Sequence, residues 1–314
     1  MSKQTNSKTI KTSIGGQAVI EGVMMRGPKL TALSVRMPDQ SISTETWDTP
    51  NSNKWYKKTP FIRGVFNFVE SLTDGYKSLM KAAEKSGLDD EEEEPSKFEQ
   101  KLRQLLGDKF MPFLQGCILL FSLAMALFFF AFLPTTLVGF FKDYINHPLA
   151  LSALEGLTKI AILILYLALI SNMSDIKRVF MYHGAEHKTI FCYEHGEELT
   201  VENVRKYTRF HPRCGTSFLV IVLLLSILVS SMVSWDNLWM RVGLKVLCLP
   251  IIMSLSYECI KFAGRHDNLF TRILSAPGLW TQRLTTREPD DSMIEVAIAS
   301  MKKVIPENPD EALF

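Results

Sequence analysis

The segment MPFLQGCILLFSLAMALFFFAFL, residues 111–133, contains 23 consecutive residues without a charged side chain. A helix of this length is about 34 Å long, and the hydrocarbon core of a bilayer is about 30 Å thick. Pro134 follows directly, and proline favours the end of a helix. The sequence therefore predicts a membrane-spanning helix here.

Three more apolar segments follow, at about Leu157–Met173, Ser217–Val233 and Val242–Cys259. Lys159 lies in the first of these and can extend its amine to a lipid headgroup, and Pro250 predicts a kink in the last. A soluble core helix explains one such run but not four. We therefore expect a mainly α, polytopic helical membrane protein with about four spans.

The composition fits a chain with both soluble and membrane parts. Of the 314 residues, 47% are hydrophobic, the net charge is +2 and the mean hydropathy is slightly positive. The net charge is small and the basic residues are scattered between acidic ones, which argues against nucleic acid as a partner. The five cysteines lack a disulfide-like spacing and indicate a reducing compartment. The first 16 residues contain no apolar core, so we expect no cleavable signal peptide.

The distribution of lysine and arginine predicts the orientation in the membrane. These residues are concentrated before the first span, in the connection between the second and third spans, and after the fourth span. The other two connections contain few of them. Because positive charge accumulates on the cytoplasmic side, we expect both termini and the histidine-rich loop to be cytoplasmic.

The expected organisation has five parts. Residues 1–60 form a small cytoplasmic α+β region, in which TALSVRMPDQSISTET (residues 31–46) predicts a hairpin that turns at Pro38-Asp39. Apolar residues recur at helical spacing in 61–88, which predicts an amphipathic helix lying on the membrane or on the protein's own bundle. Residues 89–96 form an acidic linker. Residues 97–275 form the transmembrane domain, which includes a metal-binding loop at 174–216. Residues 276–314 form a cytoplasmic tail that contains an amphipathic helix.

The stretch YHGAEHKTIFCYEHG, residues 182–196, collects side chains that bind metals. A helix that begins near Asp175 and ends near Glu194 would place His183 and His187 one turn apart on one face. With Glu186, they form H-x-x-E-H, the inverted order of a metallopeptidase motif. In that chemistry the histidines bind Zn²⁺ or another divalent metal, and the glutamate takes a proton from water. Two ordinary interfacial histidines are the simpler explanation.

Further candidate ligands lie close to the predicted cytoplasmic membrane face. His211 and Cys214 precede the third span, and Glu258 lies at the end of the fourth. An ionisable residue at the end of an apolar run needs a partner, so Glu258 is a ligand, a partner of a histidine or part of a salt bridge. His195 is a further candidate, although a residue beside Gly196 also fits a simple helix end. Cys214 fits a ligand and a buried thiol equally well.

Two kinds of metal site remain open at this stage. His183, His187, His211 and Cys214 together would form a closed tetrahedral site, which stabilises structure without chemistry. Two histidines and one carboxylate would leave a coordination position for water, with Glu186 as the base. A structural site needs no glutamate beside its histidine, so the presence of Glu186 beside His187 favours a catalytic site.

Four stretches resemble the YqhQ-type family of bacterial membrane proteins, which is described as uncharacterised and as a predicted metal-dependent enzyme family. They are GGQAVIEGVMMRGP (15–28), HGAEHK (183–188), HPRCGTSF (211–218) and QRLTTREPDDSMIEVAI (282–298). The resemblance implies a multi-span protein of the bacterial cell membrane that binds a metal. It also implies site roles for His183, Glu186, His187, His211 and Cys214, and a role for Glu21.

The sequence thus predicts a membrane-embedded, zinc-dependent hydrolase of peptidase type, with Glu186 as the catalytic base. Its partners would be the lipid bilayer and a membrane-protein or peptide substrate. The alternative is a metal-stabilised membrane scaffold that assists or regulates other membrane proteins. A transporter is disfavoured, because few ionisable residues are found deep in the spans and no internal repeat is visible.

Overall fold

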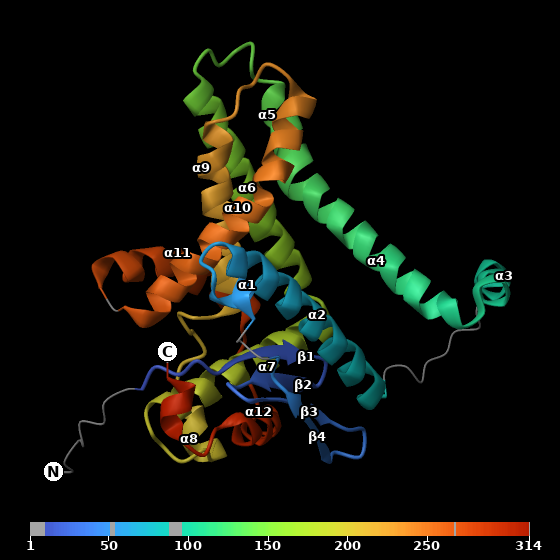
Figure 1. The fold of residues 1–314 in the computed structure, drawn as a ribbon, viewed down its shortest axis with the longest axis vertical. Helices are drawn as coiled ribbons and strands as arrows, with labels where there is room; N and C mark the ends of the chain where they lie inside the picture. The colour runs from blue at the N-terminus through green and yellow to red at the C-terminus, as the bar shows by residue number, and fades with distance from the viewer. Residues whose placement is uncertain (1–9, 51–53, 88–95, 267, 314) are drawn as a thin grey trace. The chain divides into compact units, whose positions relative to one another are not determined.

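The computed structural model describes residues 10–50, 54–87, 96–266 and 268–313 (Figure 1). The chain divides into two compact units. The sheet unit comprises Met1–Leu88, Tyr166–Val222 and Pro250–Phe314, and the helical unit comprises Asp89–Leu165 and Leu223–Leu249. The predicted acidic linker lies almost entirely outside the described residues.

A four-stranded antiparallel sheet forms the centre of the sheet unit. Its strands are β1 (Gly15–Val19), β2 (Gly22–Arg26), β3 (Leu30–Arg36) and β4 (Ile42–Asp48), and neighbours in sequence pair with one another. The predicted hairpin is present as β3 and β4, with Pro38 and Asp39 in the turn. A two-residue loop joins β1 to β2, and its second residue, Glu21, has a positive φ of 48°. The prediction of a small N-terminal sheet region in a mainly helical chain is confirmed.

Helices cover both faces of this sheet. On one face, α7 (Ser174–Glu194) and α12 (Asp291–Val304) contribute to a core that includes Val23, Met25 and Ala32 of the strands. On the other face, Met24, Leu33 and Val35 form a second core with Ala82 of α2 (Ile62–Lys85). Because side chains alternate across a strand, β2 supplies both cores and is buried along almost its whole length. The sheet unit is thus an α/β/α sandwich.

Shorter helices complete the sheet unit. They are α1 (Trp55–Lys58), α8 (Val201–Arg205) and α11 (Leu269–Thr285). The amphipathic helix expected over 61–88 is α2, and the one expected in the tail is α12, whose apolar face is buried in the core. The boundary expected between residues 275 and 276 falls inside α11.

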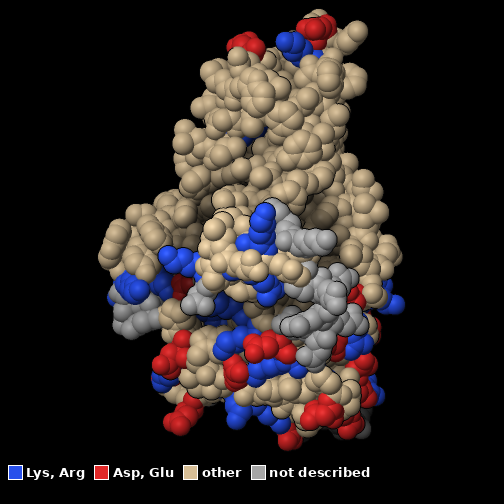
Figure 2. Space-filling model, turned by 90° about the vertical axis from the view of Figure 1, so that its right-hand side faces the viewer, with Lys and Arg blue, Asp and Glu red and all other residues tan. Residues whose placement is uncertain are grey.

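The helical unit contains α3 (Lys97–Leu106), α4 (Phe110–Leu127) and α5 (Leu133–Gly139), with a π-helical segment at Phe128–Phe132 between the last two. Three longer helices contribute to both units: α6 (Pro148–Ile170), α9 (Gly215–Ser231) and α10 (Leu238–Arg265). In Figure 2, charged side chains crowd the surface of the sheet unit, whereas the helical unit shows few of them apart from a small group at one end.

Three helical stretches are long and apolar enough to cross a membrane. They are Phe113–Gly139, Pro148–Ile170 and Leu238–Arg265. The predicted third span corresponds to α9, which has only 17 residues. Seventeen residues extend about 26 Å, somewhat less than the hydrocarbon core. Helix α6, which corresponds to the predicted second span, begins nine residues earlier than expected, at Pro148. The added turns contain Glu155, which is buried and paired with Lys159.

Candidate metal centre

Helix α7 carries the H-x-x-E-H motif in its buried middle turns. The helix begins after Met173, with Asp175 in its first turn, and ends at Glu194, where Gly196 has a φ of +69°. Its middle turns are buried against the sheet and α12. Gly184 permits a close approach of the backbone carbonyl of Arg287, which a Cβ at position 184 would overlap. The segment that follows α11 therefore lies directly on the motif.

Backbone carbonyls orient both histidines of the motif. Nδ1 of His183 lies 2.8 Å from the Thr285 carbonyl oxygen, and Nδ1 of His187 lies 2.6 Å from that of Arg209. A carbonyl can only accept, so each Nδ1 carries the hydrogen and each Nε2 presents a lone pair. In metal sites, a hydrogen bond from the other ring nitrogen to a carbonyl usually orients the histidine in this way.

Cys214 completes a three-ligand group with these histidines. Its Sγ lies 3.1 Å from Nε2 of His183, and one donor atom from each of His183, His187 and Cys214 lies within 4.8 Å of the other two. Nε2 of His187 is buried and has no hydrogen-bond partner in the described part of the chain. Buried polar atoms rarely lack a partner, so this nitrogen is available to bind a metal ion. Zinc, which prefers histidine and thiolate donors, fits the three residues.

The ionisation of these side chains suits a metal site. Burial lowers the pKa of His187 to about 4, which keeps the imidazole neutral at physiological pH. Burial opposes ionisation of Cys214, but His187 and the hydrogen bonds from Thr216 outweigh it, so the pKa of the thiol is lower than usual. A neutral imidazole and a readily formed thiolate are the protonation states that bind a metal.

Glu186 lies beside this group and is almost fully buried. Its Oε2 has no hydrogen-bond partner among the described residues. Burial raises the pKa of the carboxyl group to about 8. The first glycines of β1 cover it, since an ideal Cβ on Gly16 would lie only 2.9 Å from the Glu186 carboxyl carbon. The glycine-rich N-terminal segment therefore reaches the site through Gly16.

A cavity of about 170 Å³ adjoins the metal-binding group. Glu186, His187 and Cys214 all line it, together with Gly15 and Gly16 of β1. The three-ligand group is thus accessible from a space that could hold water and part of a substrate.

The structure does not place His211 in the three-ligand group. His211 also lines the cavity, and its ring centroid lies 5.5 Å from that of His187. Its Nε2, however, lies 3.7 Å from a carboxylate oxygen of Glu194, which also forms an ion pair with Arg213. The Glu194–Arg213 pair was not anticipated from the sequence, although both residues stand beside the predicted ligands.

The other candidate ligands have partners elsewhere. Glu258 forms an ion pair with Arg63 and accepts a hydrogen bond from the backbone of Phe61. Glu21 accepts hydrogen bonds from Arg178 at 2.5 Å and from Tyr182 at 3.2 Å.

His195 also has its own partner. Its Nδ1 lies 2.7 Å from the carbonyl oxygen of Phe191, one turn earlier in α7. None of Glu258, Glu21 and His195 belongs to the group of described residues that could hold the metal.

The chain is thus mainly helical, with three apolar helical stretches long enough to cross a membrane and a His₂Cys group that could hold a metal beside a buried glutamate. The chain belongs to the family described as "Protein of unknown function (DUF1385)", whose model matches residues 59–307. It is 36% identical over 299 residues to "Uncharacterized protein YqhQ" of Bacillus subtilis (strain 168), covering 94% of this chain and 93% of that protein. The resemblance to the YqhQ-type family is therefore confirmed. No solved structure matches.

Proposed function

We propose that the protein is a zinc-dependent hydrolase of the bacterial cell membrane that cleaves peptide bonds. The observation that carries this proposal is the buried Glu186 carboxyl group. It lies with an unpartnered oxygen beside the group formed by His183, His187 and Cys214, at a shared cavity.

Membrane location is supported by the three helical stretches of membrane-spanning length and composition. The concentration of lysine and arginine beside the apolar segments supports a cytoplasmic position for both termini and for the metal site. Helix α9 begins at Gly215, directly after Cys214. Cys214 would therefore lie close to the membrane face.

Zinc held by His183, His187 and Cys214 would have three protein ligands. Catalytic zinc sites commonly have three protein ligands and an open position, whereas structural sites have four. When bound, the ion would polarise a carbonyl group and acidify water. The carbonyls of Thr285 and Arg209 would keep both imidazoles in the required orientation.

Glu186 would act as the general base. A base must lie within hydrogen-bond reach of the proton that it removes, and Glu186 lines the same cavity as His187 and Cys214. Its elevated pKa of about 8 would fall when a cation binds nearby, which would leave the carboxylate ready to accept a proton. Its Oε2 makes no competing hydrogen bond within the described residues.

The edge of the sheet supports a peptide as substrate. β1 is the first strand in the order β1-β2-β3-β4 and pairs with β2 alone among the described strands. Gly15 and Gly16 of β1 line the cavity and have exposed surface. An extended peptide can add to such a strand edge through backbone hydrogen bonds, which would place a peptide bond near Glu186.

The proposal can be tested before a natural substrate is known. The full chain purified in detergent is loaded with Co²⁺, which gives a thiolate charge-transfer band and visible d–d bands. We expect the thiolate band to vanish in Cys214→Ser. A hydroxamate should shift the d–d bands of the wild-type protein, because it occupies an open coordination position. A closed four-ligand site, as in a structural scaffold, would leave the bands unchanged.

Catalysis is then tested with a library of fluorogenic peptides. We expect Glu186→Gln to keep its zinc and to lose turnover by at least about 100-fold. Glu84→Gln is a matched control, because Glu84 is an exposed residue of α2. If Glu186→Gln lost its zinc or kept wild-type turnover, Glu186 would not be the base.

A further inference from the structure

Four charged side chains are buried together in the helical unit, and none of them belongs to the candidate metal centre. Glu155 and Lys159 lie one turn apart on α6, and Arg241 and Lys245 lie one turn apart on α10. Their relative exposures are 0%, 2%, 1% and 6%. Such residues inside apolar helices usually mark a functional site.

The cluster has more positive than negative charge. Glu155 is the acceptor for Lys159 at 3.0 Å, for Arg241 at 2.9 Å and for Lys245 at 2.5 Å. One carboxylate against three basic groups leaves a formal excess of two positive charges. An unbalanced charge in an apolar interior is costly, so the excess favours binding of an anion.

Neutral groups satisfy the hydrogen bonds of the cluster without balancing its charge. Lys245 donates to the Thr135 hydroxyl at 2.7 Å, and Lys159 to the Ser230 hydroxyl at 3.1 Å. Arg241 donates to the backbone carbonyls of Ser230, Val233 and Ser234. Arg241 would therefore contribute mainly its charge to a bound anion.

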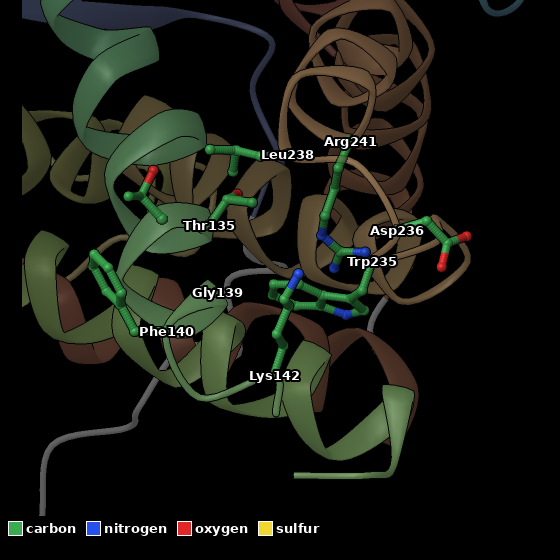
Figure 3. A pocket seen from close by; sticks show the side chains of 9 residues that line it. Thr135, Gly139, Phe140, Lys142, Trp235, Asp236, Leu238 and Arg241 are labelled. Atoms are coloured by element: carbon green, nitrogen blue, oxygen red, sulfur yellow. The ribbon is translucent and has the colours of Figure 1, made fainter. Parts of the chain in front are cut away.

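A cavity of about 240 Å³ adjoins the cluster at Arg241 and Thr135. Figure 3 shows the Lys142 amine and the Arg241 guanidinium both directed toward the Trp235 indole. The central guanidinium carbon of Arg241 lies 3.7 Å from the centroid of the Trp235 ring. Asp236 also lines the cavity, but its carboxylate accepts a hydrogen bond from the Ser234 hydroxyl. It points away from both cations (Figure 3).

Lys142 provides the donors that Arg241 lacks. Its side chain is exposed, and its amine has no hydrogen-bond or ion-pair partner among the described residues. Two cations at one small cavity repel each other unless an anion lies between them. Ammonium and guanidinium groups are the usual partners of phosphate oxygens.

We propose that this cavity binds a phosphate group, carried by the headgroup of an anionic lipid or present as free phosphate. The cavity is smaller than the roughly 300–1,000 Å³ pockets of drug-sized ligands, which suits a single phosphate-bearing group. Phe140 lines the cavity and is 71% exposed, and Leu137 and Trp239, which are next in sequence to the lining residues Thr136 and Leu238, are 42% and 71% exposed. These apolar surfaces would accommodate the acyl chains of a lipid.

The test uses delipidated full-length protein in detergent. Native mass spectrometry measures retention of phosphatidylglycerol against phosphatidylcholine with identical acyl chains, and thermal unfolding measures stabilisation by inorganic phosphate against chloride. Lys142→Gln is the main variant. Lys101→Gln is the matched control, because it removes an exposed lysine from α3 of the same unit.

We expect Lys142→Gln to weaken phosphatidylglycerol binding about tenfold, as for the loss of one charge-assisted contact, and Lys101→Gln to have no effect. Lys142-dependent stabilisation by inorganic phosphate, without retention of phosphatidylglycerol, would support the site and identify free phosphate as its ligand. Equal binding by wild type and Lys142→Gln in both assays would overturn the proposal.

Arg241→Lys, which keeps the positive charge, is a second variant. We expect Arg241→Lys to bind phosphate more strongly than Lys142→Gln does. Arg241→Lys can also bind phosphate as strongly as the wild type while Lys142→Gln loses binding. This result supports the site, because Arg241 contributes mainly charge. If the wild-type protein shows no preference for phosphatidylglycerol over phosphatidylcholine and no stabilisation by phosphate, the proposal is wrong.

Discussion

Gly16 lies against Glu186 so closely that an ideal Cβ at position 16 would be 2.9 Å from the glutamate's carboxyl carbon. Residues 170 positions apart in the sequence thus share one contact. The N-terminal sheet forms one wall around the carboxyl group, and the H-x-x-E-H helix supplies the carboxyl group itself. A side chain larger than glycine at position 16 would displace this carboxyl group.

Gly16→Ala tests the importance of this contact. The added methyl group must displace the Glu186 carboxyl group, and a shift of about 1 Å in a catalytic group costs about 100-fold in rate. We expect turnover of a fluorogenic peptide to fall by that factor while zinc content, measured by elemental analysis, stays the same. Gly15→Ala is the matched control, because nothing lies within 4 Å of a Cβ there. Equal effects of the two substitutions would contradict the prediction.

Zinc affinity distinguishes the three-ligand site from a closed four-ligand site. We expect His187→Ala and Cys214→Ser each to weaken zinc binding by more than about 100-fold, above the range for an outer-shell residue. His211→Ala should cost about tenfold or less, because Glu194 already holds that ring. Competition with a chromophoric chelator measures all three. A loss in His211→Ala as large as in His187→Ala would establish His211 as the fourth ligand.

Proton release on zinc binding reports the raised pKa of Glu186. With a pKa of about 8 in the empty site, the carboxyl group is about 90% protonated at pH 7. A bound dication favours the carboxylate and lowers this pKa, so the proton is released. We expect zinc binding at pH 7 to release about one proton more from wild type than from Glu186→Gln. The difference should shrink as pH rises above 8, where Glu186 is already ionised.

Calorimetry in two buffers with different ionisation enthalpies measures the number of protons released. Equal release by wild type and Glu186→Gln at pH 7 would mean that Glu186 does not change its protonation state when zinc binds, which would contradict the prediction. The Cys214 proton is common to both proteins and cancels in the comparison.

Glu258→Gln distinguishes a structural carboxylate from a metal ligand. The substitution weakens the partly exposed ion pair with Arg63, which is worth about 1 kcal/mol or less. We expect the unfolding temperature in detergent to fall by a few degrees at most and zinc affinity to stay unchanged. Glu84→Gln, on the exposed face of α2, is the control for both measurements. Loss of zinc from Glu258→Gln would return this residue to the metal site.

Much of the fold follows from local patterns in the sequence. The alternation in residues 31–46 predicted the β3–β4 hairpin, and the period of 3.6 in residues 61–88 predicted α2. The end of α7 was predicted at His195-Gly196, where Gly196 has the positive φ that glycine tolerates best. Such features depend on neighbours in the chain, so the sequence alone is sufficient.

The buried charges show where such patterns fail. Lys159 was predicted to reach a lipid headgroup, but it is 2% exposed and paired with Glu155. Arg241 and Lys245 belong to another helix, so their pairing with Glu155 depends on how α6 and α10 pack. The available signal in the sequence was that Glu155 and Lys159, and also Arg241 and Lys245, are four residues apart within or beside apolar segments.

The sequence by itself determined the types of metal-binding side chains and the placement of His183, Glu186 and His187 on one helical face, because helical geometry relates residues three and four apart. Only the tertiary structure decided that Cys214 joins the histidines while Glu194 holds His211, and that Gly16 covers Glu186. Those outcomes depend on long-range packing and on competition among hydrogen-bond partners. Each buried polar group finds the partner that the folded chain brings within reach.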